Sequence, residues 1–324
     1  MAMTRPRQAT ELARMENLVK VFRTPKGSLV ACDHISLRLE QGTSLGLVGE
    51  SGSGKTTLVR ILLMLERPTS GRVWLNGVEV TRLSERRLKP HRRLIQFVAQ
   101  DPYSSLFPNL TVGQNIMEPL RVHKVGRAQE RMQRAMELME RVGLSTYHFY
   151  AYPHELSGGQ QQRVAIARAL ALSPQAVVLD EAVSSLDVSV QAQILNLLQQ
   201  LKDEMGLTYL FISHNLAVIR LLCEMTAVMY MGRIVEYGKT DDVLHSPSHP
   251  YTRSLIASIP SFTDRGVTPL PDLSSLAGER PSPLRLPPGC AYQTRCPLVS
   301  ERCRAERPEL REVASGQCVA CHHA

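Results

Sequence analysis

The stretch SLGLVGESGSGKTTLVRILLML, residues 44–65, decides the fold of this chain. It begins as a buried strand, enters a glycine-rich loop and continues at once as a helix that must stop before Pro68. Gly49, Gly54, Lys55 and Thr56 fill the pattern G-x-x-x-x-G-K-[ST] between that strand and that helix. In this context the pattern indicates a phosphate-binding loop, with a tight turn that binds nothing as the alternative.

The residue types of the loop suit phosphate chemistry. Glycines let the backbone N–H groups of residues 51–56 turn toward phosphate oxygens, Lys55 can reach terminal phosphates, and Thr56 offers a hydroxyl to Mg²⁺. Phe22 precedes the loop and could stack on a nucleobase, although a core aromatic is the alternative. The predicted nucleotide-binding residues of the loop are Gly49, Ser51, Gly52, Ser53, Gly54, Lys55, Thr56 and Thr57.

Two further apolar runs end in polar residues. QAVVLDEA (175–182) and TYLFISH (208–214) are separated by a predicted helix over 189–206, and strands that alternate with helices favour a parallel sheet covered on both faces. Asp180 can hold Mg²⁺, and Glu181 can polarise a water molecule. His214 should emerge at the same sheet edge, where a contact to a γ-phosphate is favoured over a structural role.

A second half-site for phosphate is predicted at LSGGQQQRVAIARAL, residues 156–170. Ser157 is a good N-cap, and Gly158 and Gly159 leave the first helical N–H groups accessible without a nearby carboxylate. Since the loop at 49–57 already holds one phosphate group, each half-site should complete the other in a second subunit.

Composition limits the possible classes of protein. The 324 residues carry a net charge of +8 and 43% hydrophobic residues, which is enough for one substantial core and a smaller unit. We expect no membrane-spanning helix, no secretion signal and reduced cysteines. The positive charge favours anionic partners such as nucleotide, nucleic acid or an acidic membrane surface, with an ordinary solvated surface as the alternative.

In order and spacing, GESGSGKTT, VAQDPYSSL, LSGGQQQR, VVLDEAVSSLD and FISHNL resemble the ATP-binding subunit of ABC transporters. The sequences SPSHPYTRSLIASIP, SPLRLPPGC and RCP resemble the subfamily that serves oligopeptide and dipeptide importers, in particular its F-type ATPase. The resemblance implies an α/β core with a phosphate loop, a parallel sheet, an antiparallel β subdomain and a helical subdomain at about 101–170. The nucleotide-binding domain is expected over 1–238 and a cysteine-containing extension over 239–324. The segment after 238 is rich in Pro, Ser and Gly, which favours an extended arm over a packed layer.

The resemblance also implies roles for individual residues. Glu181 would be the general base, and Gln100 would link Mg²⁺ and the attacking water to the helical subdomain. Thr56, Gln100 and Asp180 would surround Mg²⁺, and His214 would act in catalysis. The opposite subunit's ATP would be contacted by Ser157, Gly158, Gly159 and Gln160, and Ser185 to Asp187 would lie across the dimer seam.

Three positions depart from the usual pattern of this family. Ala182 stands where proline follows the catalytic glutamate, which could loosen the loop that holds Glu181. Ala99 replaces an aromatic residue before Gln100, and Asn215 replaces an aspartate after the histidine. None of these changes removes a side chain to which the resemblance gives a catalytic role. Their expected effect is therefore on the rate of hydrolysis.

Five of the seven cysteines crowd the C-terminal part of the sequence, and the candidate ligands among them are Cys290, Cys296, Cys303 and Cys321, with Cys318 as a possible spare. In a reducing compartment clustered thiols suit metal ligation better than disulfides, although the spacing lacks the C-x-x-C pairs of zinc ribbons. The resemblance implies a [4Fe-4S] cluster, with ordinary tail thiols as the alternative.

The predicted function is ATP hydrolysis coupled to peptide uptake at the cytoplasmic face of the inner membrane. Expected partners are a second ATPase subunit, a paralogue with which the chain forms a dimer, two transmembrane permeases and an extracytoplasmic substrate-binding protein, but no nucleic acid. The alternatives are a soluble ABC ATPase that acts on nucleic acid and a regulatory nucleotide-binding module without turnover. The first is disfavoured because only about a hundred residues separate the loop from LSGGQ, too few for the long coiled coils of DNA-repair members. Glu181 and His214 disfavour the second.

Overall fold

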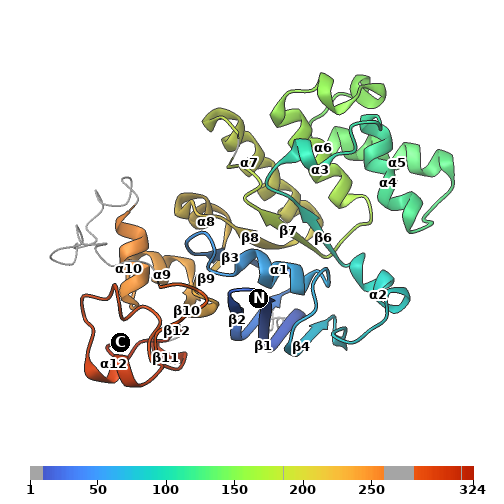
Figure 1. The fold of residues 1–324 in the computed structure, drawn as a ribbon. Helices are drawn as coiled ribbons and strands as arrows, with labels where there is room; N and C mark the ends of the chain where they lie inside the picture. The colour runs from blue at the N-terminus through green and yellow to red at the C-terminus, as the bar shows by residue number, and fades with distance from the viewer. Residues whose placement is uncertain (1–9, 185, 259–280, 315) are drawn as a thin grey trace, which may run out of the picture. The chain divides into compact units, whose positions relative to one another are not determined.

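The computed structural model describes residues 10–184, 186–258, 281–314 and 316–324. These residues form two compact units, which we describe separately. The loop unit consists of residues 16–35, 44–71 and the described residues from 211 onward, and the helical unit consists of 10–15, 36–43 and 72–210. Figure 1 gives the element labels used below.

Four strands contribute residues to both units: β1 (Glu11–Thr24), β2 (Gly27–Glu40), β4 (Ser70–Leu75) and β8 (Thr208–Ile212). The loop unit further contains β3 (Ser44–Val48), α1 (Lys55–Leu62), α8 (Leu216–Leu222), β9 (Met225–Tyr230), β10 (Arg233–Lys239), α9 (Thr240–His245), α10 (Pro250–Ala257), α12 (Glu301–Ala305), β11 (Arg311–Ala314) and β12 (Gln317–Val319). The helical unit contains β5 (Val78–Glu79), α2 (Glu85–Arg92), β6 (Ile95–Val98), α3 (Pro102–Ser105), α4 (Val112–Val122), α5 (Ala128–Arg141), η1 (Thr146–Tyr150), η2 (Pro153–Glu155), α6 (Gly158–Leu170), β7 (Ala176–Asp180) and α7 (Val188–Met205).

The loop unit is built on a mixed sheet. β3 pairs in parallel with β9, which pairs antiparallel with β10; β12 covers the other side of β10 and pairs with β11. All five residues of β3 are buried, as expected for a strand covered on both faces. Helix α8 approaches β3 closely, because a Cβ at Gly46 would lie 2.6 Å from Ile219.

The helical unit combines a parallel strand pair, β6 with β7, and a short antiparallel pair, β4 with β5. Helices α4, α5 and α6 pack on one another through apolar faces that include Ile116, Leu138 and Val164, each fully buried. Parallel strands, antiparallel strands and helices are therefore all present, and the predicted α/β class is confirmed.

Two local expectations differ from the structure. The helix after the phosphate loop ends at Leu62, before the predicted residue 65, because Met64 adopts a left-handed φ of 54°. The Pro- and Ser-rich segment after 238, expected to be extended, contains α10, where Pro250 occupies the first turn and Tyr251 is buried. Part of that segment, residues 259–280, lies outside the described residues.

No helix of the described ranges combines the length and the apolar character that a membrane span requires.

Candidate functional site

The phosphate loop of the loop unit has a shape that only glycine allows at two positions. Gly49 has a φ of 150°, and a Cβ there would lie 2.2 Å from the carbonyl oxygen of Met229. Gly54 has a φ of 106°, and its Cβ would lie 2.2 Å from the carbonyl oxygen of Ala31. Any side chain at either position would collide with backbone, so the sequence pattern reflects close packing of the loop against its own unit.

Lys55 turns its ammonium group back into this loop. The side chain is buried, and Nζ donates hydrogen bonds to the carbonyl oxygens of Gly49 at 2.7 Å and Glu50 at 2.9 Å. Thr56 follows at the exposed start of α1, whose first turn carries no acidic side chain. A buried cation, a helix N-terminus and a chain of loop N–H groups together favour a bound anion.

The helical unit brings together two predicted catalytic side chains. Gln100 lies after β6, Glu181 lies after β7, and Gln100 Nε2 donates to Glu181 Oε2 at 2.9 Å. Asp101 fixes the Gln100 segment by capping α3, where its carboxylate accepts from the N–H groups of Tyr103 and Ser104 at 3.0 and 3.3 Å.

Glu181 adopts a left-handed backbone conformation with a φ of 48°, which a non-glycine residue rarely adopts. Its carbonyl oxygen accepts hydrogen bonds from Ser184 N at 3.0 Å and Ser184 Oγ at 2.9 Å. The following Ala182 is buried. Local strain of this kind persists where surrounding contacts hold it, and it is common at reactive sites.

The start of α6 forms a capping box. Ser157 Oγ accepts from Gln160 N at 3.3 Å, and the Gln160 side chain accepts from Ser157 N at 2.9 Å. A Cβ on Gly159 would lie 2.5 Å from Val190, whereas one on Gly158 would meet only Leu186 at an ordinary 3.6 Å. Packing within the unit therefore demands glycine at 159 but not at 158.

The remaining predicted residues divide between the units. Asp180 ends β7 and exposed Asp187 is the N-cap of α7, both in the helical unit. His214 is exposed after β8 in the loop unit, where Asn215 caps α8 by accepting from Ala217 N at 3.0 Å. Phe22 lies in β1 with Lys20 Nζ 4.8 Å from its ring centre. Ser185 lies outside the described residues.

The four candidate ligand cysteines are free, and their thiols act electrostatically on one another. Burial, and then the nearby thiols, raise the pKa of Cys296 to about 11 and also raise the pKa values of Cys290 and Cys321. Within the described ranges, however, no three Cys, His, Asp or Glu side chains form a group able to hold a metal ion. The structure thus does not support the predicted iron–sulfur ligand set, because the described residues contain no closed group of ligands.

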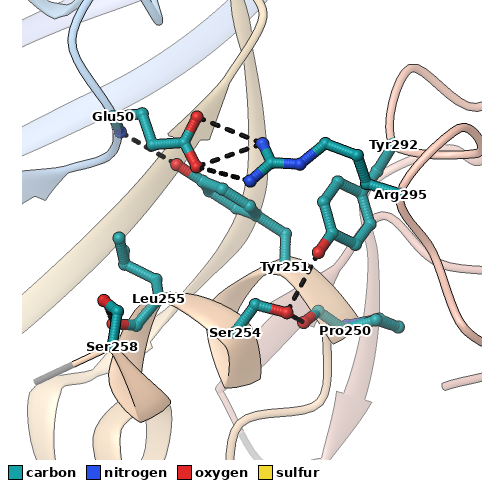
Figure 2. A network of polar contacts seen from close by, with 8 residues as sticks. All are labelled: Glu50, Pro250, Tyr251, Ser254, Leu255, Ser258, Tyr292 and Arg295. Atoms are coloured by element: carbon teal, nitrogen blue, oxygen red, sulfur yellow. Dashed lines mark hydrogen bonds and ion pairs between the residues drawn. The ribbon is translucent and has the colours of Figure 1, made fainter. Parts of the chain in front are cut away.

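One contact of the loop was not predicted. Arg295 forms an ion pair with Glu50, inside the phosphate loop, and Tyr251 accepts a hydrogen bond from Glu50 N (Figure 2). The sequence carries only a weak signal of it, since Tyr251 and Arg295 belong to the motifs that mark the tail but lie far from Glu50 along the chain.

Comparison with known protein families assigns two regions of the chain. Residues 32–184 match the ABC transporter family, and residues 235–303 match the oligopeptide/dipeptide transporter C-terminal region.

Curated relatives match nearly the whole chain. A putative peptide import ATP-binding protein of Brucella ovis is 44% identical over 316 residues, covering 96% of this chain and 98% of that protein. The oligopeptide transport ATP-binding protein AppF of Bacillus subtilis is 43% identical over 303 residues, covering 93% and 92%. The di/tripeptide transport ATP-binding protein DppF of Pseudomonas aeruginosa is 45% identical over 294 residues, covering 91% and 90%.

Solved structures of similar fold cover the larger part of the chain. The dimeric ATP-binding cassette MJ0796, bound to ADP and Pi in a post-hydrolysis state, is 32% identical with a TM-score of 0.65 and covers 71% of this chain and 99% of that one. The cbiO1 protein of Clostridium perfringens, part of the ABC transporter complex cbiONQ, is 27% identical with a TM-score of 0.66 and covers 73% and 92%.

Proposed function

The chain belongs to the ABC transporter family of ATP-binding proteins, and from this premise we propose that it is the ATP-hydrolysing subunit of a membrane importer of peptides. The observation that carries the proposal is the union, in one chain, of an ABC transporter region with the C-terminal region of oligopeptide and dipeptide transporters. The comparisons give no support to the alternative of a nucleic-acid ATPase, because the relatives described above carry transport names.

Binding of ATP begins at the phosphate loop. The N–H groups of residues 51–56 and the Lys55 ammonium surround the β- and γ-phosphates, and Phe22 stacks on the base. The inward orientation of the buried Lys55 side chain supports this assignment. His214 contacts the γ-phosphate from the segment that follows β8.

Hydrolysis is assigned to the Gln100–Glu181 pair. Glu181 accepts a proton from a water molecule whose oxygen bonds to the γ-phosphorus, while the bond from that phosphorus to the β–γ bridging oxygen breaks and ADP leaves. The hydrogen bond of 2.9 Å from Gln100 orients the carboxylate for this proton transfer.

Mg²⁺ fits the residue types that the chain offers. Thr56 supplies a hydroxyl, Asp180 a carboxylate and Gln100 an amide, all oxygen donors of the kind a hard cation prefers. Thr56 is exposed at the start of α1, so its hydroxyl is accessible to a metal–nucleotide complex. The metal, when bound, neutralises charge on the phosphate oxygens.

A second copy or a paralogue completes each site. Its Ser157, Gly158, Gly159 and Gln160 contact the γ-phosphate, and its Asp187 lies beside the seam. Support comes from Gly158, which packing within its own unit does not require, and from the dimeric state of the similar cassette MJ0796.

The transport assignment includes partners and a location. Two transmembrane permeases and an extracytoplasmic binding protein complete the importer, and the chain sits peripherally on the cytoplasmic face of the inner membrane. Residues 1–238 form the nucleotide-binding domain, with the helical subdomain at about 101–170, and residues 239–324 form the extension.

The tail cysteines carry a separate cofactor proposal. A [4Fe-4S] cluster on Cys290, Cys296, Cys303 and Cys321 is implied by the resemblance and is supported by residue type alone, since the described structure contains no closed ligand group. Iron and sulfide analysis with an absorption spectrum of anaerobically purified protein tests it. Colourless, iron-free protein from a preparation that retains nucleotide binding overturns it.

Co-purification tests the function. The chain, extracted from membranes in detergent, should elute with two multi-span proteins and show an ATPase activity that Glu181→Gln reduces by about 10²–10⁴-fold. Retention on DNA that weakens steeply with salt, without membrane partners, would instead establish the nucleic-acid alternative.

A further inference from the structure

Glu50, inside the phosphate loop, is held by the C-terminal part of the chain. The Arg295 guanidinium donates to both carboxylate oxygens of Glu50, with N–O distances of 3.1, 3.2 and 3.1 Å. The Tyr251 hydroxyl accepts a hydrogen bond from Glu50 N at 2.9 Å. Figure 2 shows both groups converging on this one residue from α10 and from the segment after it.

The ion pair is partly shielded from water. The Arg295 side chain is only 8% exposed and that of Glu50 28%, whereas the tail's Arg302–Glu306 pair is 67% and 62% exposed. A bidentate arginine–carboxylate pair that is mostly removed from solvent restricts the positions of its two side chains more than an exposed pair does.

Packing fixes the two tail residues that reach the loop. Tyr251, Tyr292 and Tyr230 are buried and in mutual ring contact, with ring centres 4.5 to 5.5 Å apart. Arg295 lies over the Tyr292 ring at 5.7 Å, and Tyr292 Oη is 3.0 Å from Ser254 Oγ on α10 (Figure 2). Contacts within the C-terminal part of the chain therefore hold the arginine in place, independently of its ion pair with Glu50.

Glu50 is in turn joined to the residues that face a nucleotide. Its carbonyl oxygen accepts from Lys55 Nζ at 2.9 Å and from Ser53 N at 3.2 Å. The N–H, the carbonyl and the side chain of this one residue thus each have a fixed partner. A displacement of Glu50 shifts both the loop backbone and the lysine.

We propose that Arg295 and Tyr251 are positioning residues for nucleotide, through which the C-terminal extension holds the phosphate loop in its binding shape. The inference rests on the proposed function and adds a form of regulation to it. Arg295 directly precedes Cys296 in the sequence. A conformational change at the cysteines would therefore move Arg295 and, through its ion pair with Glu50, the phosphate loop.

The test compares the binding of Mg-ADP by calorimetry in full-length variants, because ADP lacks the γ-phosphate that the second subunit is proposed to contact. Arg295→Gln should weaken binding about tenfold, Tyr251→Phe about threefold, and Arg295→Lys should fall between Arg295→Gln and the unsubstituted chain. Arg302→Gln, which removes the exposed ion pair of the same tail, is the matched control and should bind as the unsubstituted chain does. In assays of ATP turnover, Arg295→Gln and Tyr251→Phe should raise KM and leave kcat within about twofold of the value for the unsubstituted chain.

The outcomes separate the two proposals. If the unsubstituted chain binds no ADP, both proposals fail. If it binds ADP and the folded Arg295→Gln variant binds equally well, the coupling alone is wrong. Should Arg295→Gln not fold, Tyr251→Phe replaces it as the deciding variant, because it removes a single oxygen; unchanged affinity there overturns the coupling. A lower urea midpoint with an unchanged Kd identifies a purely structural role and also overturns it.

Discussion

Replacing Gly158 by alanine separates function from packing at the start of α6. The new methyl group would meet Leu186 Cδ2 at 3.6 Å, an ordinary contact, and alanine is the better helix former. We expect the free energy of unfolding to rise by about 0.5 kcal/mol. ATP turnover of the assembled complex should nevertheless fall at least about tenfold, because the methyl group would occupy the place where we propose that the helix N–H groups approach a phosphate.

Gly159→Ala is the matched variant one residue along the same helix. Its methyl group would lie 2.5 Å from Val190 Cγ1, on a side chain with little freedom about χ1. Overpacking of this kind lowers the free energy of unfolding by about 1–3 kcal/mol. Urea unfolding and ATPase assays at saturating ATP measure both effects. Full turnover in a stable Gly158→Ala variant would refute the close approach of this helix start to nucleotide.

Three further predictions concern single side chains. Glu181→Gln should reduce turnover by about 10²–10⁴-fold while ATP binding is retained, as radiolabelled ATP retention and gel filtration would detect; unchanged turnover excludes Glu181 as the base. Burial lowers the pKa of His249 from 6.5 to about 3. Between these two pH values the imidazole is protonated in the unfolded chain but not in the folded chain, so the free energy of unfolding decreases as pH falls from about 6.5 toward 3. Between pH 7.5 and 5.5 the free energy of unfolding measured in urea should decrease by about 1 kcal/mol through this group. His249→Asn removes the titrating imidazole but keeps an acceptor for the N-cap hydrogen bond, so this pH-dependent decrease should disappear. Asn115, fully buried, bonds Phe107 N at 2.9 Å and three carbonyl oxygens at 3.0 to 3.1 Å, so Asn115→Ala should lower the free energy of unfolding by about 2–4 kcal/mol, and an unchanged urea midpoint would contradict this.

The sequence predicts structure well where backbone geometry fixes the residue type. The phosphate-loop pattern is one case, since Gly49 faces a backbone oxygen that no side chain could avoid. The helix predicted over 189–206 is another: it spans Val188–Met205 and ends at Gly206, whose φ of 63° supplies a left-handed C-cap.

Prediction is poorer where the partner is distant or where two residue signals compete. Glu50 and Arg295 are 245 positions apart, and no local pattern joins them. After Ser157 the first turn carries no acidic residue, yet the amide of Gln160 completes the capping box in place of a carboxylate. Many prolines suggested an extended tail, yet Pro250 in a first turn begins a helix as readily as it ends one.

The pairing of β12 with β10 has a consequence for how the chain emerges during synthesis. β10 ends at Lys239 and β12 begins at Gln317, so the ribosome must add the entire intervening stretch before that side of β10 can be covered. An open strand edge readily recruits another chain. A polypeptide released before Gln317 would therefore tend to aggregate through this edge. Such truncated products should require chaperones more than the full-length protein does.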